Sequence, residues 1–476
     1  MKTNLVVNLP NWWFKAKKYP HLYTMFRHKT LIVVFSFIIC ANSHAQKDYT
    51  RKGDSLGLIN PNDPKNYARK VVDTLASPYM AGRGYIDDGD KKAAKYISSQ
   101  MSQFGLSHFG DSYEQQLSFN VNTFPEKIEV SVIRTNAGMN ISMKQEPGAD
   151  YIVLPNSCSM KGTFVVKRVT KNTLSDKAKI YEFTHQDLKK TFLLIDDTNM
   201  TDKTQRAFVE SMRYNPFKAK GVIILCKKLT EETSDSVADY VLIDALYNSK
   251  FDSATSVSVD IKNKFVKNYT SQNLIGYIKG TVQPDSFIVF SAHYDHLGRM
   301  GTIFFPGAND NASGTAMLLS LAKYYSAYPG NLRYSVAFIA FTGEEMGLFG
   351  SHYYVQHPLF PLSKIKFEVN MDIMGTGDEG ITVVNAPTYD GAFHDLLKIN
   401  DSLHFLKQIK PRGATSNSDH YFFYANHVPD FFIYTMGGLK AYHDIYDRRE
   451  TLPLTNFDDV FHLLQHFTDD ICNRRF

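Results

Sequence analysis

Tryptophan and cysteine are scarce in this chain. Its 476 residues contain 2 tryptophans, Trp12 and Trp13, and 4 cysteines. The cysteines follow neither zinc-finger nor redox-motif spacing, so the sequence excludes a cysteine-based structural zinc site and a disulfide-rich scaffold. The cysteines beyond residue 45 permit at most one disulfide, and we expect free thiols instead at Cys158, Cys226 and Cys472.

The N-terminal region has an apolar run that is too short to cross a bilayer. Residues 31–41 are apolar and follow the basic residues Arg27 and Lys29, but a membrane span takes about 20 residues. Ser43-His44-Ala45 then offers the small residues that a signal peptidase reads. We predict a cleaved signal peptide over residues 1–45, with Met25 as an alternative start, and export of a mature chain that has no membrane span.

Net positive charge is absent from the predicted mature chain. The formal charge of +5 includes six lysines and arginines within residues 1–45, which hold no acidic residue, so the mature value is 5 − 6 = −1. A near-neutral chain gives no electrostatic reason to expect nucleic-acid binding. Hydrophobic residues make up 43% and charged residues 21%, which is typical of a globular protein.

The rest of the chain divides by its periodicity. After a polar lead-in, residues 46–63, amphipathic helices are predicted at 67–76 and 90–104. Residues 125–267 have a helical stretch at 204–213 and strand-like alternation at 128–132, with short strands at 163–169, 180–183, 192–195, 222–225 and 257–261. From residue 268 strands and helices alternate to the C-terminus. We predict an α/β domain with a mixed, mostly parallel sheet flanked by helices (64–124 and 268–476), interrupted by a β-rich module (125–267).

Polar side chains follow each predicted strand of the α/β domain. The strand-like run 287–290 leads into His293, and Asp310 precedes an apolar helix at 312–325. The runs 333–341, 365–369 and 431–434 are followed by Glu345, Asp372 and His443. Ligands gather at the carboxyl ends of strands in open α/β sheets, so we expect these side chains to meet.

This residue set favours a catalytic zinc centre, because it combines imidazoles and carboxylates without cysteine. Asp310 is the natural bridge between two ions, with His293 and Asp372 on one and Glu345 and His443 on the other. Glu344 adjoins a ligand but is not needed as one, so its carboxylate could take a proton from a metal-bound water. Asp295 could accept from the second imidazole N–H of His293 and so fix the orientation of that ring. Taken singly, a histidine at a strand end or a Glu-Glu pair is more often a simple hydrogen-bonding or solvated group. Joint occurrence at successive strand ends supports the site. His420 is predicted either to be structural or to line a substrate pocket.

Five segments together resemble a known family. They are His293-Tyr294-Asp295, residues 307–314, Gly343-Glu344-Glu345, Asn370-Met371-Asp372 and Tyr442-His443. In order and spacing they are similar to the co-catalytic two-zinc aminopeptidases, which include the bacterial leucyl aminopeptidases. The resemblance implies a zinc exopeptidase-like fold, the five ligands above and Glu344 as general base. It also implies Asp295 as partner of His293, Tyr442 as donor to the developing oxyanion and a cis Asp310–Asn311 peptide. By position and strand content, residues 125–267 resemble a protease-associated domain.

The leading hypothesis is therefore an exported peptidase with two zinc ions that removes the N-terminal residue of peptides. One alternative within the resembling family is a single-zinc glutaminyl cyclase-type acyltransferase, which typically uses a pocket tryptophan that the predicted mature chain lacks. Others are a glutamate carboxypeptidase and a binding protein that retains an idle site. The sequence sets neither side-chain preference nor oligomeric state.

Overall fold

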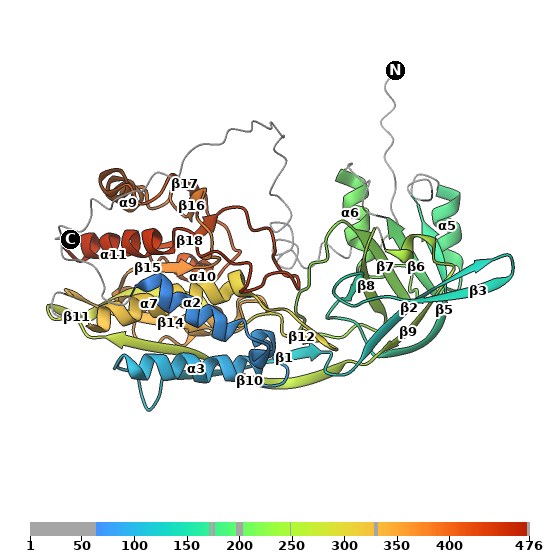
Figure 1. Ribbon diagram of the computed structural model, residues 1–476, viewed down its shortest axis with the longest axis horizontal. Helices are drawn as coiled ribbons and strands as arrows, with labels where there is room; N and C mark the ends of the chain where they lie inside the picture. Colours follow the sequence, from blue (N-terminus) through green and yellow to red (C-terminus); the bar gives the residue numbers. More distant parts are fainter. Residues whose placement is uncertain are drawn as a thin grey trace, which may run out of the picture.

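Two eight-stranded sheets organise the chain (Figure 1). The computed structural model describes residues 63–170, 173, 177–196, 203–247, 249–327 and 332–473. The predicted signal peptide and nearly all of the lead-in lie outside this range. Each sheet has its own hydrophobic core. Within the described residues, none of the helices is both long and apolar enough to cross a bilayer.

The first sheet is mixed and carries helices on both faces, as predicted. Its strand order is β1-β10-β14-β11-β15-β18-β16-β17, and the central strands β14, β11, β15 and β18 run parallel. The bounds are β1 Glu114–Thr123, β10 Lys264–Ile278, β14 Tyr334–Phe341, β11 Gln283–His293, β15 Ile365–Met371, β18 Asp430–Met436, β16 Gly380–Val384 and β17 Ile409–Arg412. Every residue of β14 is buried, which is typical of a parallel strand covered on both sides.

One face of this sheet packs against the larger helices, namely α2 (Pro64–Leu75), α3 (Gly89–Gln103), α7 (Gly314–Ala327), α9 (Asp390–Leu403) and α11 (Phe457–Asn473). The other face meets α8 (Phe349–Gln356) and α10 (His420–Ala425). Helix α2 begins at Asp63, whose carboxylate accepts from the backbone N–H of Lys65 at 3.1 Å, with Pro64 at the first helical position. Helix α7 is apolar almost all round because it lies between the sheet and other helices.

The second sheet has the order β3-β2-β9-β5-β6-β7-β8-β4. Its bounds are β2 Ile128–Asn136, β3 Met139–Lys144, β4 Tyr151–Val153, β5 Met160–Val169, β6 Thr191–Asp196, β7 Gly221–Cys226, β8 Val241–Leu246 and β9 Ser256–Ile261. Strands β5 to β8 are parallel. Helices α5 (Lys177–His185) and α6 (Lys203–Met212) lie between successive strands of this group.

The predicted strand at 180–183 was wrong, because these residues belong to helix α5. Parallel strands such as β5 and β6 need a crossover connection, usually a helix. The local composition of Ile180, Tyr181 and Phe183 suggested a strand, but the parallel pairing of the flanking strands requires a helix there.

Strand β1 was not predicted. It leads from the half of the molecule built on the first sheet to the half built on the second sheet, which we call the inserted half. Its apolar residues Leu117, Phe119 and Val121 alternate with polar ones, and it pairs antiparallel with β10 from Glu114↔Leu274 to Thr123↔Lys264. The chain therefore leaves the first sheet along β1 and returns beside it along β10.

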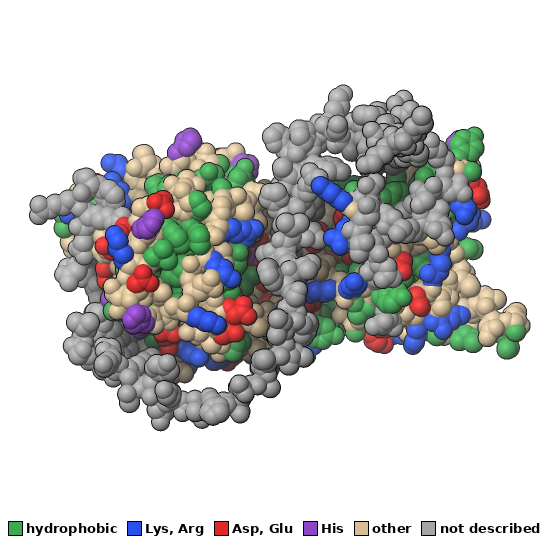
Figure 2. Space-filling view, turned by 90° about the horizontal axis from the view of Figure 1, so that it is seen from above, with side chains coloured by type: hydrophobic (Ala, Val, Ile, Leu, Met, Phe, Trp, Pro, Cys, Tyr) green, Lys and Arg blue, Asp and Glu red, His purple; other side chains and the backbone are tan. Residues whose placement is uncertain are grey.

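Charged side chains of both signs are interspersed on the described atoms of the face in Figure 2.

Short elements complete the described chain: η3 Pro78–Arg83, η4 Lys250–Ser253, the π-helical turn η5 Ala308–Ser313, η7 Leu362–Lys364, and the two-residue strands β12 Arg299–Met300 and β13 Ile303–Phe304. The expected cis peptide is present at Asp310–Asn311. Cys158, Cys226 and Cys472 are free, as expected.

Candidate metal centre

The fold brings all five predicted ligands together. His293 is the last residue of β11, and Glu345 and Asp372 follow the ends of β14 and β15. His443 lies in the loop after β18, and Asp310 lies in η5, directly before α7. The parallel strands end at one edge of the sheet, so their loops share this edge.

Asp310 lies between two histidines, with one oxygen toward each. Its Oδ1 is 3.4 Å from His293 Nε2, and its Oδ2 is 3.1 Å from His443 Nε2. On one side, Asp372 Oδ1 is 3.3 Å from His293 Nε2. On the other, Glu345 Oε2 is 3.2 Å from His443 Nε2. The five side chains therefore form two groups, one around His293 and one around His443, and both groups share the carboxylate of Asp310.

Both imidazoles present Nε2 to the centre because Nδ1 is engaged elsewhere. His293 Nδ1 lies 3.2 Å from the backbone oxygen of Asp295, and His443 Nδ1 lies 2.9 Å from that of Glu231. A carbonyl oxygen can only accept a hydrogen bond, so Nδ1 must carry a proton in both histidines, and each ring in its neutral form then has its lone pair on Nε2. This is the state in which a histidine binds a metal ion.

The field at the centre is negative. Burial lowers the pKa of His293, but the carboxylates of Asp372 and Glu344 hold this pKa well above its ordinary value. The pKa of His443 is likewise held high against burial, mainly by Glu345. Burial raises the pKa of Asp310, yet its contacts with both imidazoles hold it well below the usual value. Such a field, with nitrogen and oxygen donors converging, suits a bound cation of the zinc type.

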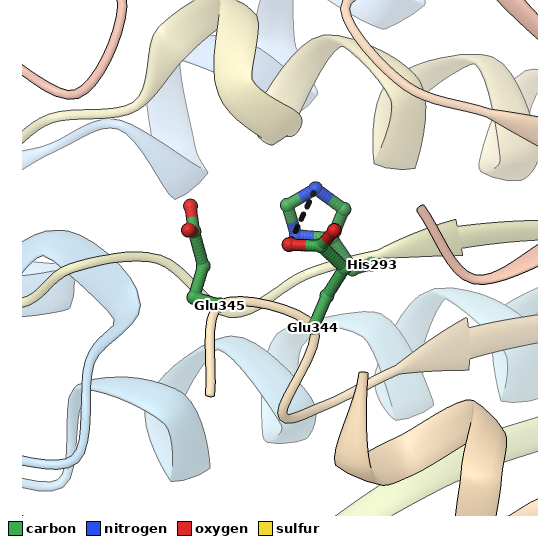
Figure 3. A group of neighbouring side chains, drawn as sticks. All are labelled: His293, Glu344 and Glu345. Atoms are coloured by element: carbon green, nitrogen blue, oxygen red, sulfur yellow. Dashed lines mark ion pairs between the residues drawn. The ribbon is translucent and has the colours of Figure 1, made fainter. Parts of the chain in front are cut away.

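Glu344 lies beside the five candidate ligands but is not one of them. Its Oε2 is 4.0 Å from His293 Nε2, and Figure 3 shows its carboxylate reaching toward the imidazole of His293 while Glu345 stands apart on the same turn. Asp295, fully buried, accepts from the backbone N–H groups of Glu344 and Glu345, both at 3.3 Å. Asp295 Oδ1 is also 3.6 Å from His293 Nδ1. Asp295 therefore fixes the turn as well as the histidine.

Several supporting residues were not predicted. Tyr85 donates to Asp295 Oδ2 at 2.5 Å and accepts from the N–H of Gly343. His296 contacts Glu345 Oε1 through Nδ1 at 2.8 Å. Asp447 accepts from the N–H of Asp310 at 2.9 Å, and Asn309 also donates to it.

Arg83 supports the same loop from below. It is fully buried, and its guanidinium donates to five backbone carbonyls, which are those of Leu75, Tyr294, Pro306, Gly307 and Asp310. Arg83 lies in the glycine-rich segment 80–84, and no sequence motif marked it as a support of the centre.

A loop of the second sheet's half also reaches the centre. It follows β7 and spans residues 228–234. Glu231 exchanges two hydrogen bonds with His443: its N–H donates to the His443 oxygen at 2.9 Å, and its own oxygen accepts from Nδ1. Thr233 Oγ1 donates to the oxygen of Glu345 at 2.5 Å, and Lys228 Nζ to that of Tyr442 at 2.8 Å. The inserted half therefore contacts two of the five predicted ligands.

The remaining predicted residues lie close by. Tyr442 stacks on His443 with ring centroids 4.0 Å apart and is half-buried. His420 has no exposed surface; its ring stacks on Phe432, and its Nε2 lies 3.1 Å from the oxygen of Thr415. Burial lowers the pKa of His420 to about 3. These contacts are those of a structural side chain, and the substrate-pocket alternative for His420 stays a prediction.

A family model describes part of the chain. The model for peptidase family M28 matches residues 273–468, from β10 into α11. This segment includes all five predicted ligands and Glu344. Over this segment the chain is similar to peptidase family M28.

Curated relatives of the M28 segment match over short stretches. Aminopeptidase YwaD of Bacillus subtilis is 37% identical over 133 residues, which are 28% of each chain. A probable leucine aminopeptidase 2 of Aspergillus oryzae is 33% identical over 144 residues, 30% of this chain and 26% of its own. The chain thus matches only about a quarter of the length of these relatives.

Solved structures share the fold over most of the chain. The zinc aminopeptidase BSAP from Bacillus subtilis has a TM-score of 0.60 at 21% identity and covers 85% of this chain and 94% of its own. A peptidase M28 precursor from Shewanella amazonensis has a TM-score of 0.61 at 15% identity, and the match covers 86% of this chain and 98% of that protein. The M28 segment is therefore set in a fold that these proteins share, including regions outside residues 273–468.

Proposed function

We propose that this protein is an exported aminopeptidase that uses a pair of zinc ions to hydrolyse the first peptide bond of peptides. The orientation of Asp310 carries the proposal, since its oxygens lie 3.4 Å from His293 Nε2 and 3.1 Å from His443 Nε2. A carboxylate with one oxygen toward each imidazole would suit a ligand shared by two metal ions. The match of residues 273–468 to the M28 model and the aminopeptidase names of the relatives support the same reaction.

In this proposal His293 and Asp372 would hold one ion, Glu345 and His443 would hold the other, and Asp310 would serve both. Zinc bound there would supply Lewis acidity and lower the pKa of water toward about 7, which would provide a nucleophile at neutral pH. The backbone carbonyls of Asp295 and Glu231 keep the two imidazoles in the binding tautomer.

Glu344 acts as the general base. It takes a proton from the attacking water and passes it to the nitrogen of the leaving amine. Its side chain is 7% exposed and reaches the centre from a turn whose N–H groups Asp295 holds. Tyr442, stacked on His443, is the proposed donor to the oxyanion that forms on the scissile carbonyl.

Substitution of Glu344 by Gln tests the base. We expect kcat to fall by about 10² to 10⁴ because the proton transfer is lost, while zinc content measured by metal analysis stays at the wild-type value. Glu379→Gln, at an exposed position, is the control and should keep full activity. A Glu344→Gln protein with bound zinc and a wild-type rate would refute the assignment.

A substrate panel separates the proposal from its rivals. Aminoacyl anilides report aminopeptidase activity, peptides ending in glutamate report carboxypeptidase activity, and peptides starting with glutamine report cyclisation. We expect turnover of the anilides with two zinc ions per chain. Cyclisation with one ion per chain would favour the acyltransferase.

Export and the role of the inserted half belong to the same proposal. We assign residues 1–45 to a signal peptide, 64–124 and 268–476 to the peptidase domain, and 125–267 to a protease-associated-like domain. The N-terminal sequence of the protein recovered outside the cytoplasm should begin near Gln46. Recovery of an uncleaved chain from the cytoplasm alone would contradict export.

A further inference from the structure

A buried hydrogen-bond chain runs from Asp372 away from the metal centre. Ser418 Oγ contacts Asp372 Oδ2 at 3.1 Å, and Asn370 Nδ2 contacts Ser418 Oγ at 2.8 Å. Asn370 Oδ1 contacts Ser291 Oγ at 2.9 Å, and Ser291 Oγ contacts Glu368 Oε1 at 2.5 Å. All five side chains are buried. The chain therefore has a carboxyl group at each end and three neutral groups between them.

The number of hydrogens determines the state of these carboxyl groups. The chain has four contacts, but its inner members supply only three hydrogens, one from each serine hydroxyl and one from the Asn370 amide. If both carboxylates were ionised, two oxygen atoms in one of the four contacts would face each other with no hydrogen between them. The fourth hydrogen must come from Asp372 or Glu368. A metal ligand is deprotonated, so the proton belongs on Glu368.

The surroundings of Glu368 agree with this assignment. Burial, followed by the carboxylates of Asp430 and Asp419, raises the pKa of Glu368 well above its usual range. Glu368 Oε2 has no hydrogen-bond partner, and leaving a charged oxygen in that state costs far more than leaving the oxygen of a neutral acid. Glu368 and Asp430 lie opposite each other on β15 and β18, and Asp430 accepts from Asn385 at 2.6 Å.

We propose that Glu368 is a positioning residue: as a neutral acid it donates to Ser291 and sets the direction of a hydrogen-bond chain that ends on Asp372. Ser291 then donates to Asn370, Asn370 to Ser418, and Ser418 to Asp372. An ionised Glu368 would draw the Ser291 proton to itself, reverse the Asn370 amide and leave Asp372 without its donor. The role toward a zinc ligand rests on the proposed function, and so does the use of Asp372 as a deprotonated ligand in the hydrogen count. The burial of Glu368 and its unpartnered Oε2 do not depend on that function.

Infrared difference spectroscopy tests the protonation directly. The spectrum of the wild-type protein minus that of Glu368→Gln at neutral pH should contain the carbonyl band of a protonated carboxylic acid. Bands of an ionised carboxylate in its place would overturn the proposal. This result does not depend on zinc or on activity.

Zinc titration against a chromophoric chelator tests the positioning. Glutamine still donates to Ser291, so Glu368→Gln should bind zinc within about threefold of wild type, whereas Ser418→Ala and Ser291→Ala should each weaken one site by about 10-fold. Ser320→Ala is the control, since Ser320 is a buried serine that donates to the oxygen of Ala316 outside the chain. Thermal unfolding of the zinc-free variants separates loss of affinity from loss of fold.

Two outcomes would overturn the positioning role. One is a Ser291→Ala protein that folds and binds zinc as wild type does. The other is a Glu368→Gln protein that loses affinity as strongly as Ser291→Ala, because the charge would then be needed. A wild-type protein that bound no zinc would overturn the proposed function and the role toward Asp372, while the infrared band would still decide the protonation.

Discussion

At the scale of single residues, the sequence predicts which candidate ligands come together better than the groups that support them. The meeting of His293, Asp310, Glu345, Asp372 and His443 was predictable because each is a metal-binding residue type at the end of a strand, in the loop after one, or just before a helix. Tyr85 and Arg83 were not, because their partners lie more than 200 residues away along the chain. The carbonyl of Glu231 could not be predicted at all, since every residue has one.

Gly307 is a position where only glycine fits. Its φ is 57°, and a Cβ there would lie 2.3 Å from the oxygen of Asp310 and 2.6 Å from Arg83 Nη2. We expect Gly307→Ala to destabilise the zinc-free protein by more than about 2 kcal/mol in urea unfolding, from backbone strain and displacement of buried groups. Gly391→Ala, in the first turn of α9 with open space around it, should be neutral or slightly stabilising. Equal effects of both substitutions would contradict this reading.

Asp430 should make stability depend on pH. Burial raises its pKa to about 8 in the folded state from an ordinary 3.8. Between these values the unfolded chain has lost the proton that the folded chain keeps, so stability falls as pH rises from about 4 to about 8. Compared with wild type, Asp430→Asn should therefore gain stability by up to about 1.4 kcal/mol per pH unit across this window. Urea unfolding of both zinc-free proteins at several pH values checks this, and a pH-independent difference would contradict it.

At the scale of elements, periodicity identified most of the strands and helices, and one of the exceptions has a topological cause. Helix α5 has the composition of a strand, yet it connects two parallel strands. Strand β1 does alternate Leu117, Phe119 and Val121 with polar residues, so the strand itself was predictable although we did not predict it. Its partner β10 begins about 140 residues later, so local pattern could not supply the pairing.

The loop 228–234 should influence zinc binding although it belongs to the inserted half. Lys228→Met removes contacts to Tyr442 and Asp444, and Thr233→Val removes the contact to Glu345. We expect the double variant to weaken zinc binding by up to about 10-fold, because a supporting contact of the ligands is lost. Lys262→Met, which removes an exposed ion pair with Glu126 at 2.7 Å, is the control. Chelator competition measures both, and unchanged affinity in the double variant would show that the loop is dispensable.

At the scale of the whole molecule, the α/β fold and the residues at its sheet edge were predictable, but the contact between the two halves was not. Packing between regions distant in sequence leaves no periodic signal. Because Glu231 and His443 exchange two hydrogen bonds, we expect the stability of the inserted half to depend on whether the centre holds metal.

Removal of zinc should therefore be felt in both halves. Zinc at 1,000 times its dissociation constant stabilises the protein that binds it by about 4.1 kcal/mol, so chelation should lower the unfolding temperature. Hydrogen exchange of a peptide covering residues 228–236 should also accelerate, because the N–H of Glu231 donates to His443. Peptides from β7 serve as the internal reference. Protection of 228–236 that is unaffected by chelation would contradict the link.

The pairing of Thr123 with Lys264 has a practical consequence for protein engineering. Entry and exit of the inserted half are cross-strand neighbours, so the half can be excised and replaced as a cassette at one splice point without rerouting the first sheet. A transplanted cassette would need a backbone N–H and a backbone oxygen placed to make the two hydrogen bonds with His443 that Glu231 makes here. Chimeras that lack it should assemble and yet remain poor at retaining their metal.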